Sequence, residues 1–199
     1  KVKTFKKIMI YALLCGTMLG QGIGNHAKLW AKENFIVCID PGHQAKGDPK
    51  GEPIAPGSSS KKARVASGTA GVGTKKPEYA VNMETGLILK ELLTQKGYQV
   101  VMTRETDTSL HTTDSAKIRN QKRSDLENRK KVLQENSNGV FVSIHMNKFE
   151  QASVKGAQTF YANNDASRML AENIQNCLRE GIADGNKRIA KPAPENLYI

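Results

Sequence analysis

Cysteine is scarce in this 199-residue chain, which has only Cys15, Cys38 and Cys177. No two of them form a C-x-x-C pair, so the sequence argues against a disulfide framework. Cys38 lies inside an apolar stretch, and we expect it to be a small buried hydrophobic residue rather than a reactive thiol.

Aromatic and acidic residues are also few. The chain has five Phe, five Tyr and one Trp, and 19 acidic residues against 30 Lys and Arg, which gives a formal net charge of +11. Without a stacking platform or a recognition-helix pattern, we expect no nucleic acid partner. The charge is compatible with a membrane surface or an acidic cell-wall polymer, and equally with lysines scattered over a solvated surface.

The N-terminal region has no apolar run as long as the roughly 20 residues that a membrane-spanning helix needs. Four lysines, at positions 1, 3, 6 and 7, precede a shorter apolar run over residues 8–20. This order is typical of a secretory signal, and an uncleaved anchor is the alternative. We therefore expect residues 1–31 to be a signal peptide or N-terminal membrane anchor that meets the membrane during export, and the remainder to work outside the cytoplasm.

The rest of the chain, residues 35–199, has the pattern of one α/β domain. An apolar strand over residues 35–39 is followed by a helix that starts at Pro77 and is capped by Gly97. A second strand at 98–103 completes a βαβ unit. Such a unit requires a parallel neighbour and a right-handed crossover, so we expect a mostly parallel sheet with helices on both faces.

Further elements are indicated within and after this unit. Residues 47–76 are rich in Gly, Pro, Ser and Lys and predict a long loop insertion. The sequence Ser124-x-x-Glu127 is a capping box that predicts a helix over 124–135. Apolar strands follow at 140–145 and 158–162, and Asn164 or Asp165 is expected to cap a last helix through about residue 178.

Two histidines occupy equivalent places in this plan. His43 and His145 each follow the carboxyl end of an apolar strand, and Glu78 opens the helix that leaves the first strand. In open α/β sheets this edge is where ligands bind. Each residue alone has an ordinary explanation, as a loop histidine or a helix-dipole glutamate, but together they predict a zinc site with an open fourth position. His111, in a polar loop, is expected to be solvated.

Five motifs occur in a characteristic order. They are Ile39-Asp40-Pro41-Gly42-His43, Glu78-x-x-x-Asn82, Met102-Thr103-Arg104, Asn128-Arg129 and Val142-Ser143-Ile144-His145-x-Asn147. The chain resembles the zinc-dependent N-acetylmuramoyl-L-alanine amidases from about residue 35 to residue 199. Residues 122–129 and 156–161 look most like the sporulation-specific members, which prepare spore cortex for germination.

The resemblance implies that His43, Glu78 and His145 bind Zn²⁺ and that zinc-bound water attacks the amide between N-acetylmuramic acid and L-alanine in peptidoglycan. It places the protein in the cell wall or the forespore intermembrane space, and it leaves room for an activating partner protein. Asn147 is expected to support the site. Arg104 and Arg129 are expected either to form structural ion pairs or to contact substrate.

Two departures from the family pattern stand out. The 47–76 insertion makes the spacing between His43 and Glu78 longer than is usual in the family. It is expected to be a lid, a partner-docking surface or a tolerated insertion. The family's catalytic glutamate lies in a segment not found up to Ile199, so we expect an incomplete domain and leave the catalytic residue unassigned. Glu195, in a Pro-rich tail, is not given that role.

Two other function classes stay open beside the amidase. One is a non-catalytic peptidoglycan-binding or regulatory module of the same fold that has lost its base. The other is a basic DNA- or membrane-binding protein, which only the positive net charge supports.

Overall fold

The computed structural model describes residues 35–45, 48–53, 61–65, 68–113, 118–146, 156–182 and 185–193. The expected signal or anchor, Asn147 and Glu195 lie outside the described residues. The described residues belong to two compact units, one within 35–146 and one within 156–193.

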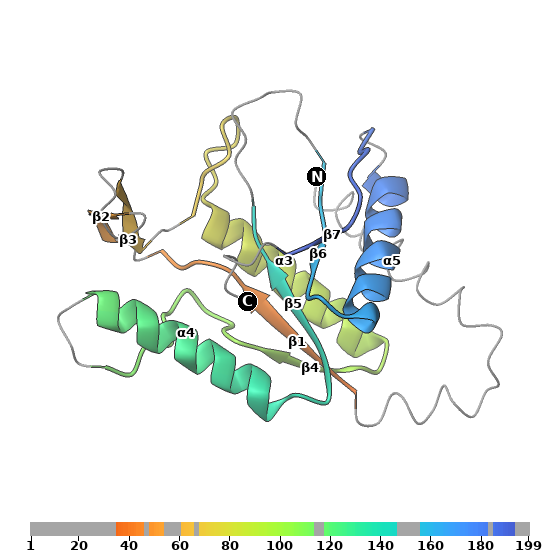
Figure 1. Ribbon diagram of the computed structural model, residues 1–199, viewed down its shortest axis with the longest axis horizontal. Coiled ribbons are helices and arrows are strands. Elements are labelled where there is room, and N and C mark those ends of the chain that lie inside the picture. Colours follow the sequence, from red (N-terminus) through yellow and green to blue (C-terminus); the bar gives the residue numbers. More distant parts are fainter. Residues whose placement is uncertain are drawn as a thin grey trace. The chain divides into compact units, whose positions relative to one another are not determined.

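The first unit is built on a three-stranded parallel sheet. Its strands are β1 (Ile36–Pro41), β4 (Gln99–Met102) and β5 (Gly139–Ile144), in the order β4-β1-β5 (Figure 1). Strand β1 lies in the centre and is buried from residue 37 to residue 41, as expected for its apolar run. The expected parallel sheet and βαβ unit are confirmed.

Helices α3 (Glu78–Gln95) and α4 (Ile118–Glu135) lie on opposite faces of this sheet. Ile39 is fully buried against the side of α3, where a Cβ on Gly86 would lie 3.6 Å from its Cγ2. Because side chains alternate along a strand, Asp40 points to the other face, where Arg129 of α4 contacts it at 2.5 Å. Helices on both faces are therefore observed, as predicted.

The hydrophobic core of this unit is small and centred on the middle strand. Val37, Ile39 and Met102 form its buried centre. Partly buried residues that pack around this centre are Met83, Leu89, Leu93, Tyr98, Val100, Val140 and Ile144.

The ends of α3 follow from local sequence. The helix begins at Glu78, with Pro77 as its extended N-cap, one residue later than predicted. It ends at Gln95, with Lys96 as its C-cap, and the next residue, Gly97, has a left-handed φ of 82°. The N–H of Tyr98 donates to the Leu93 carbonyl, which closes the last turn.

The predicted start of α4 is wrong. The helix begins at Ile118, six residues before Ser124. The Ser124 hydroxyl does not cap it but accepts the N–H of Thr112 at 3.1 Å. Ser124 of the S-x-x-E pattern instead contacts the segment that precedes the helix. The sequence pattern alone cannot distinguish such a contact from a cap.

Part of the 47–76 segment has regular structure, where the sequence predicted only a loop. Strands β2 (Asp48–Pro53) and β3 (Lys61–Val65) pair antiparallel. Before α3, a tight turn brings Ala70 and Pro77 into an isolated bridge. Backbone pairing of this kind needs no hydrophobic periodicity, and the periodicity is what the prediction relied on.

The second unit contains β6 (Phe160–Tyr161), α5 (Asp165–Ile182) and β7 (Lys191–Pro192). Strands β6 and β7 are parallel. Asn164 accepts the N–H of Ser167 at 2.8 Å, so its predicted capping role is confirmed. Throughout the described residues, the helices are too short or too polar to cross a membrane.

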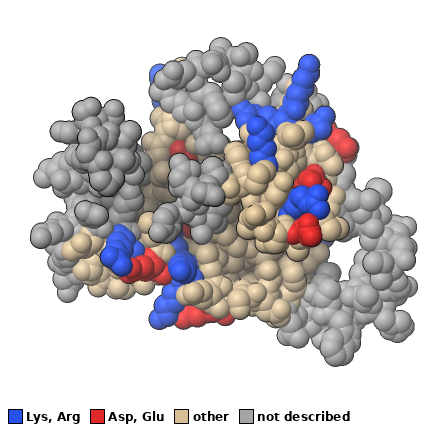
Figure 2. Space-filling model, viewed as in Figure 1, with Lys and Arg blue, Asp and Glu red and all other residues tan. Residues whose placement is uncertain are grey.

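Charges of both signs lie close together on the described surface. In Figure 2, groups of Lys and Arg side chains have Asp and Glu among them. Exposed ion pairs include Arg123 with Glu127 and Lys76 with Glu84. On the described part of the face shown, the Lys and Arg side chains thus lie in separate groups.

The two described cysteines are buried and neither forms a disulfide. Burial, with the nearby Asp40 charge, raises the pKa of the Cys38 thiol to about 11. At pH 8 this leaves about one thiol in a thousand ionised.

We therefore expect Cys38 to react with a thiol reagent at least about 100-fold more slowly in the folded protein than in denaturant. The rate is measured in a Cys15→Ser, Cys177→Ser background. Equal rates in both states would show that β1 opens readily.

Candidate metal centre

The topology of the first unit brings two histidines together. The chain runs from β1 to β4 on one side and then returns to place β5 on the other side of β1. The carboxyl ends of β1 and β5 therefore flank the point where the strand order reverses, which is the usual ligand site of such sheets. His43 follows β1 and His145 follows β5, and their rings meet edge to face with centroids 4.9 Å apart.

Glu78 completes the group from the first turn of α3. Its Oε1 lies 3.3 Å from Nε2 of His43 and 3.3 Å from Nδ1 of His145. One potential ligand atom from each residue lies within 4.8 Å of the others, and Glu78 is buried. The structure thus brings together the three residues that the sequence singled out as ligands.

The carboxylate of Glu78 is oriented by backbone groups on both sides. Thr69 N–H donates to Oε2 at 2.8 Å, and Met146 N–H donates to Oε1 at 2.8 Å. Thr69 is held in turn, because its carbonyl accepts the Glu78 N–H at 2.7 Å. Since backbone donors leave no mark in residue identity, sequence reasoning missed both contacts.

The electrostatics suit metal binding. Burial alone would raise the pKa of Glu78, but the two N–H donors and the imidazoles of His43 and His145 lower it overall. Burial, and then the charge of His43, lowers the pKa of His145. Near neutral pH these shifts favour a carboxylate and a neutral imidazole, the protonation states that a metal ion requires.

The donor set itself fits a divalent transition metal. Two imidazole nitrogens and one carboxylate oxygen are ligands found in hydrolytic zinc sites. A Cβ on Gly68 would lie 2.6 Å from Oε2 of Glu78, so only glycine allows that close backbone approach. The close packing of the Gly68 backbone on the Glu78 carboxylate distinguishes this group from a chance surface cluster of charged residues.

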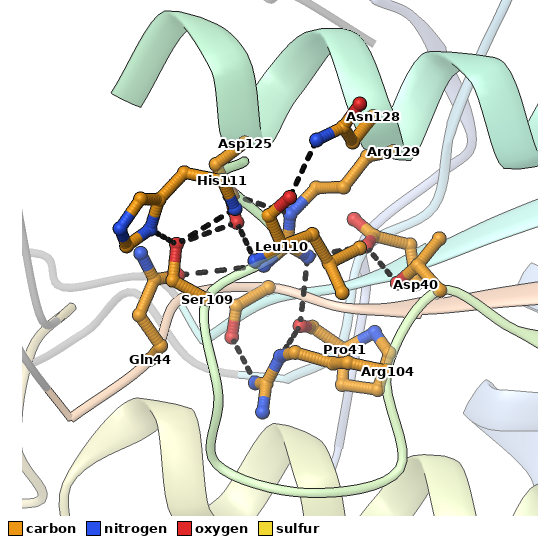
Figure 3. A network of polar contacts seen from close by, with 12 residues as sticks. Asp40, Pro41, Gln44, Arg104, Ser109, Leu110, His111, Asp125, Asn128 and Arg129 are labelled. Carbon is orange, nitrogen blue, oxygen red and sulfur yellow. Dashed lines mark hydrogen bonds and ion pairs between the residues drawn. The ribbon is translucent and has the colours of Figure 1, made fainter. Parts of the chain in front are cut away.

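Beside this group lies a buried polar network (Figure 3). Arg129 donates to Asp40 at 2.5 Å and to Asp125 at 2.8 Å. Asp40 also accepts the hydroxyls of Thr103 and Ser143. Of the two roles expected for Arg129, a structural ion pair or a substrate contact, the described residues show the ion pair.

Arg104 also has a structural environment. Its guanidinium donates to the carbonyls of Pro41, Gly42 and Thr106. Burial, and then the neighbouring Arg129 charge, lowers the pKa of Arg104. Its contacts fix backbone next to His43.

His111 differs from the prediction. It is partly buried, and its Nδ1 lies 2.7 Å from the Ser109 hydroxyl, which donates to Asp125 (Figure 3). It belongs to the edge of the Arg129 network and is outside the metal group.

The chain is similar in sequence to known amidases. The sequence profile described as N-acetylmuramoyl-L-alanine amidase, Amidase_3, matches residues 37–199. The germination-specific N-acetylmuramoyl-L-alanine amidase of Bacillus subtilis strain 168 is 29% identical over 154 residues, which are 77% of this chain and 56% of that protein. The chain therefore spans about half of the length of this curated relative.

Solved structures of amidases are also similar to this chain. The CwlD amidase from Clostridioides difficile, solved in complex with the GerS lipoprotein, is 30% identical with a TM-score of 0.66, over 81% of this chain and 74% of that one. The catalytic domain of CwlV from Bacillus (Paenibacillus) polymyxa var. colistinus is 26% identical with a TM-score of 0.52, over 80% and 71% of the two chains. With the profile matching most of its length, this chain belongs to the N-acetylmuramoyl-L-alanine amidase family.

Proposed function

We propose that this protein hydrolyses the amide bond between N-acetylmuramic acid and L-alanine in peptidoglycan, using one Zn²⁺ ion held by His43, Glu78 and His145. The observation that carries the proposal is the approach of these three side chains at the sheet edge. Family membership supplies the reaction class.

The three proposed ligands and the backbone around them have different roles. His43 and His145 offer ring nitrogens as neutral ligands, and Glu78 offers one negative charge, so a bound dication would keep a net charge of about +1. Zinc in such a site polarises a carbonyl and lowers the pKa of bound water to about 7. The N–H groups of Thr69 and Met146 hold the carboxylate in place for this role.

Cellular context extends the proposal. The similarity to a germination-specific amidase supports action on spore cortex outside the cytoplasm, in the cell wall or the forespore intermembrane space. Residues 1–31 would serve as export signal or anchor. The CwlD amidase was solved with a lipoprotein, which supports an activating partner protein for this chain as well.

We expect the purified protein with zinc to release stem peptides from sacculi. New amino termini should be L-alanine only, with no new reducing sugar ends, because an amidase leaves the glycan intact. A chelator should stop the release, and added zinc should restore it. Binding to sacculi without any release would instead indicate the non-catalytic module.

A further inference from the structure

Gly42 is tied to three elements through its backbone. Its carbonyl accepts hydrogen bonds from Asn82 Nδ2 at 3.0 Å and from Arg104 Nη2 at 3.2 Å. Its N–H donates to the Ile144 carbonyl at 3.0 Å. One residue thus connects the end of β1 with α3, with the segment after β4, and with β5.

Each of these ties is adjacent to a proposed ligand. Gly42 directly precedes His43, and Ile144 directly precedes His145. Asn82 lies one helical turn after Glu78, on the same face of α3. The distances among the three ligands therefore depend on contacts that converge on Gly42.

The Gly42 position has no room for a side chain. A Cβ there would lie 2.2 Å from Cε1 and 2.3 Å from Nε2 of His145. The His145 ring consequently packs directly on the Gly42 backbone. This contact sets the position of one imidazole relative to the loop that carries the other.

His43 needs such a constraint because its backbone is strained. Its φ of 62° lies in the left-handed region, which costs a non-glycine residue on the order of 1–2 kcal/mol. Such conformations persist where the surroundings over-determine them. The peptide joining Gly42 to His43 forms one side of this φ rotation, and its oxygen is the atom that Asn82 and Arg104 bind.

Asn82 is an unusual residue for a helix face packed on a sheet. It is fully buried, and its Oδ1 finds no hydrogen-bond partner in the described part of the chain. Burying an unpaired amide oxygen costs about 1–3 kcal/mol. Core stability alone does not account for the amide, whereas its Nδ2 contact with Gly42 does.

We propose that Asn82 is a positioning residue of the metal centre. It binds the Gly42 carbonyl and so holds His43 where that ring meets Glu78 and His145, with Arg104 as the second donor. This inference rests on the proposed metal site.

The test compares Asn82→Ala with Thr103→Val. Thr103 is a matched control because it also loses a buried hydrogen bond, to Asp40, without contacting Gly42. Zinc dissociation constants are measured by competition with a chromophoric chelator, and Tm is measured on the metal-free proteins. Both variants should lower Tm.

Only Asn82→Ala should weaken zinc binding, by about 10–100-fold, as is typical when a residue supporting a ligand is removed. Thr103→Val should stay within about twofold of the unchanged protein. If Asn82→Ala does not fold, Asn82→Ser replaces it, because serine is too short to reach the Gly42 carbonyl.

Three outcomes would overturn the inference, and they are distinguishable. An unchanged protein that binds no zinc removes the proposed metal site together with the role of Asn82. Zinc binding by Asn82→Ala at full affinity removes the role of Asn82 alone. An equal loss of affinity in both variants assigns the effect to general destabilisation.

Discussion

Replacing either His43 or His145 by alanine is expected to abolish stoichiometric zinc binding and, with it, peptidoglycan hydrolysis. Each substitution removes one of three donors that lie within 4.8 Å of one another. The loss of affinity should exceed the roughly 10–100-fold that follows removal of a residue supporting a ligand. Metal content after dialysis and stem-peptide release from sacculi are the two measurements.

Glu78→Gln tests the third ligand without changing its size. Both carboxylate oxygens accept backbone N–H groups, from Thr69 and Met146, and an amide offers only one acceptor. One of these N–H groups would then face an NH₂ donor, so both the charge and the orientation of the ligand are lost. We expect zinc loss comparable to that of the alanine variants.

His111→Ala is the matched control for these substitutions. It removes a partly buried imidazole whose contact is with Ser109, outside the metal group. Its zinc content should equal that of the unchanged protein. Full zinc in the His43 and His145 variants would place the ion elsewhere and refute the site.

The approach of His43, Glu78 and His145 to one another was predictable from sequence because the ends of buried strands can be predicted. The run at residues 35–39 marks a buried strand, and the run at 140–145 marks another. Parallel strands bring their carboxyl ends to one edge, so His43 and His145 must approach each other. Glu78 followed from the position of Pro77 at the helix start.

The supporting contacts were not predictable in the same way. Asn82 and Gly86 are buried in α3, although neither is an apolar residue of the kind that marks a buried helix face. Asn82 meets a backbone carbonyl, and Gly86 allows close approach to Pro41 and Met102. Hydrophobic periodicity detects neither kind of contact, because one is polar and the other is an absent side chain.

Asp125 shows a second kind of limit. It occupies an unspecified position of the predicted capping box Ser124-x-x-Glu127, yet it lies inside α4 and pairs with Arg129 four residues later. Its other oxygen accepts the hydroxyl of Ser109 and the N–H of Leu110. The local pattern was ambiguous, and only the packing of α4 on the sheet resolved it.

Arg129 lies at the centre of the network in Figure 3, between two buried carboxylates. Asp40, Asp125 and Arg129 are each less than 9% exposed. Burial alone would lower the pKa of Arg129, but the charges of Asp40 and Asp125 raise it overall, so the guanidinium is strongly held as a cation. Its removal would leave two buried negative charges without their shared counter-ion.

We expect Arg129→Met to lower the free energy of unfolding by about 3–5 kcal/mol, the usual effect of removing one partner from a buried ion pair. Urea unfolding of the metal-free protein measures the change. Arg123→Met is the control on the same helix, with the same change of charge, because Arg123 is 82% exposed and pairs only weakly with Glu127. That control should lose less than about 1 kcal/mol. If Arg129→Met were no more destabilising than Arg123→Met, hydroxyl and backbone donors would be sufficient to hold Asp40 and Asp125, and the network could not be what joins α4 to the sheet.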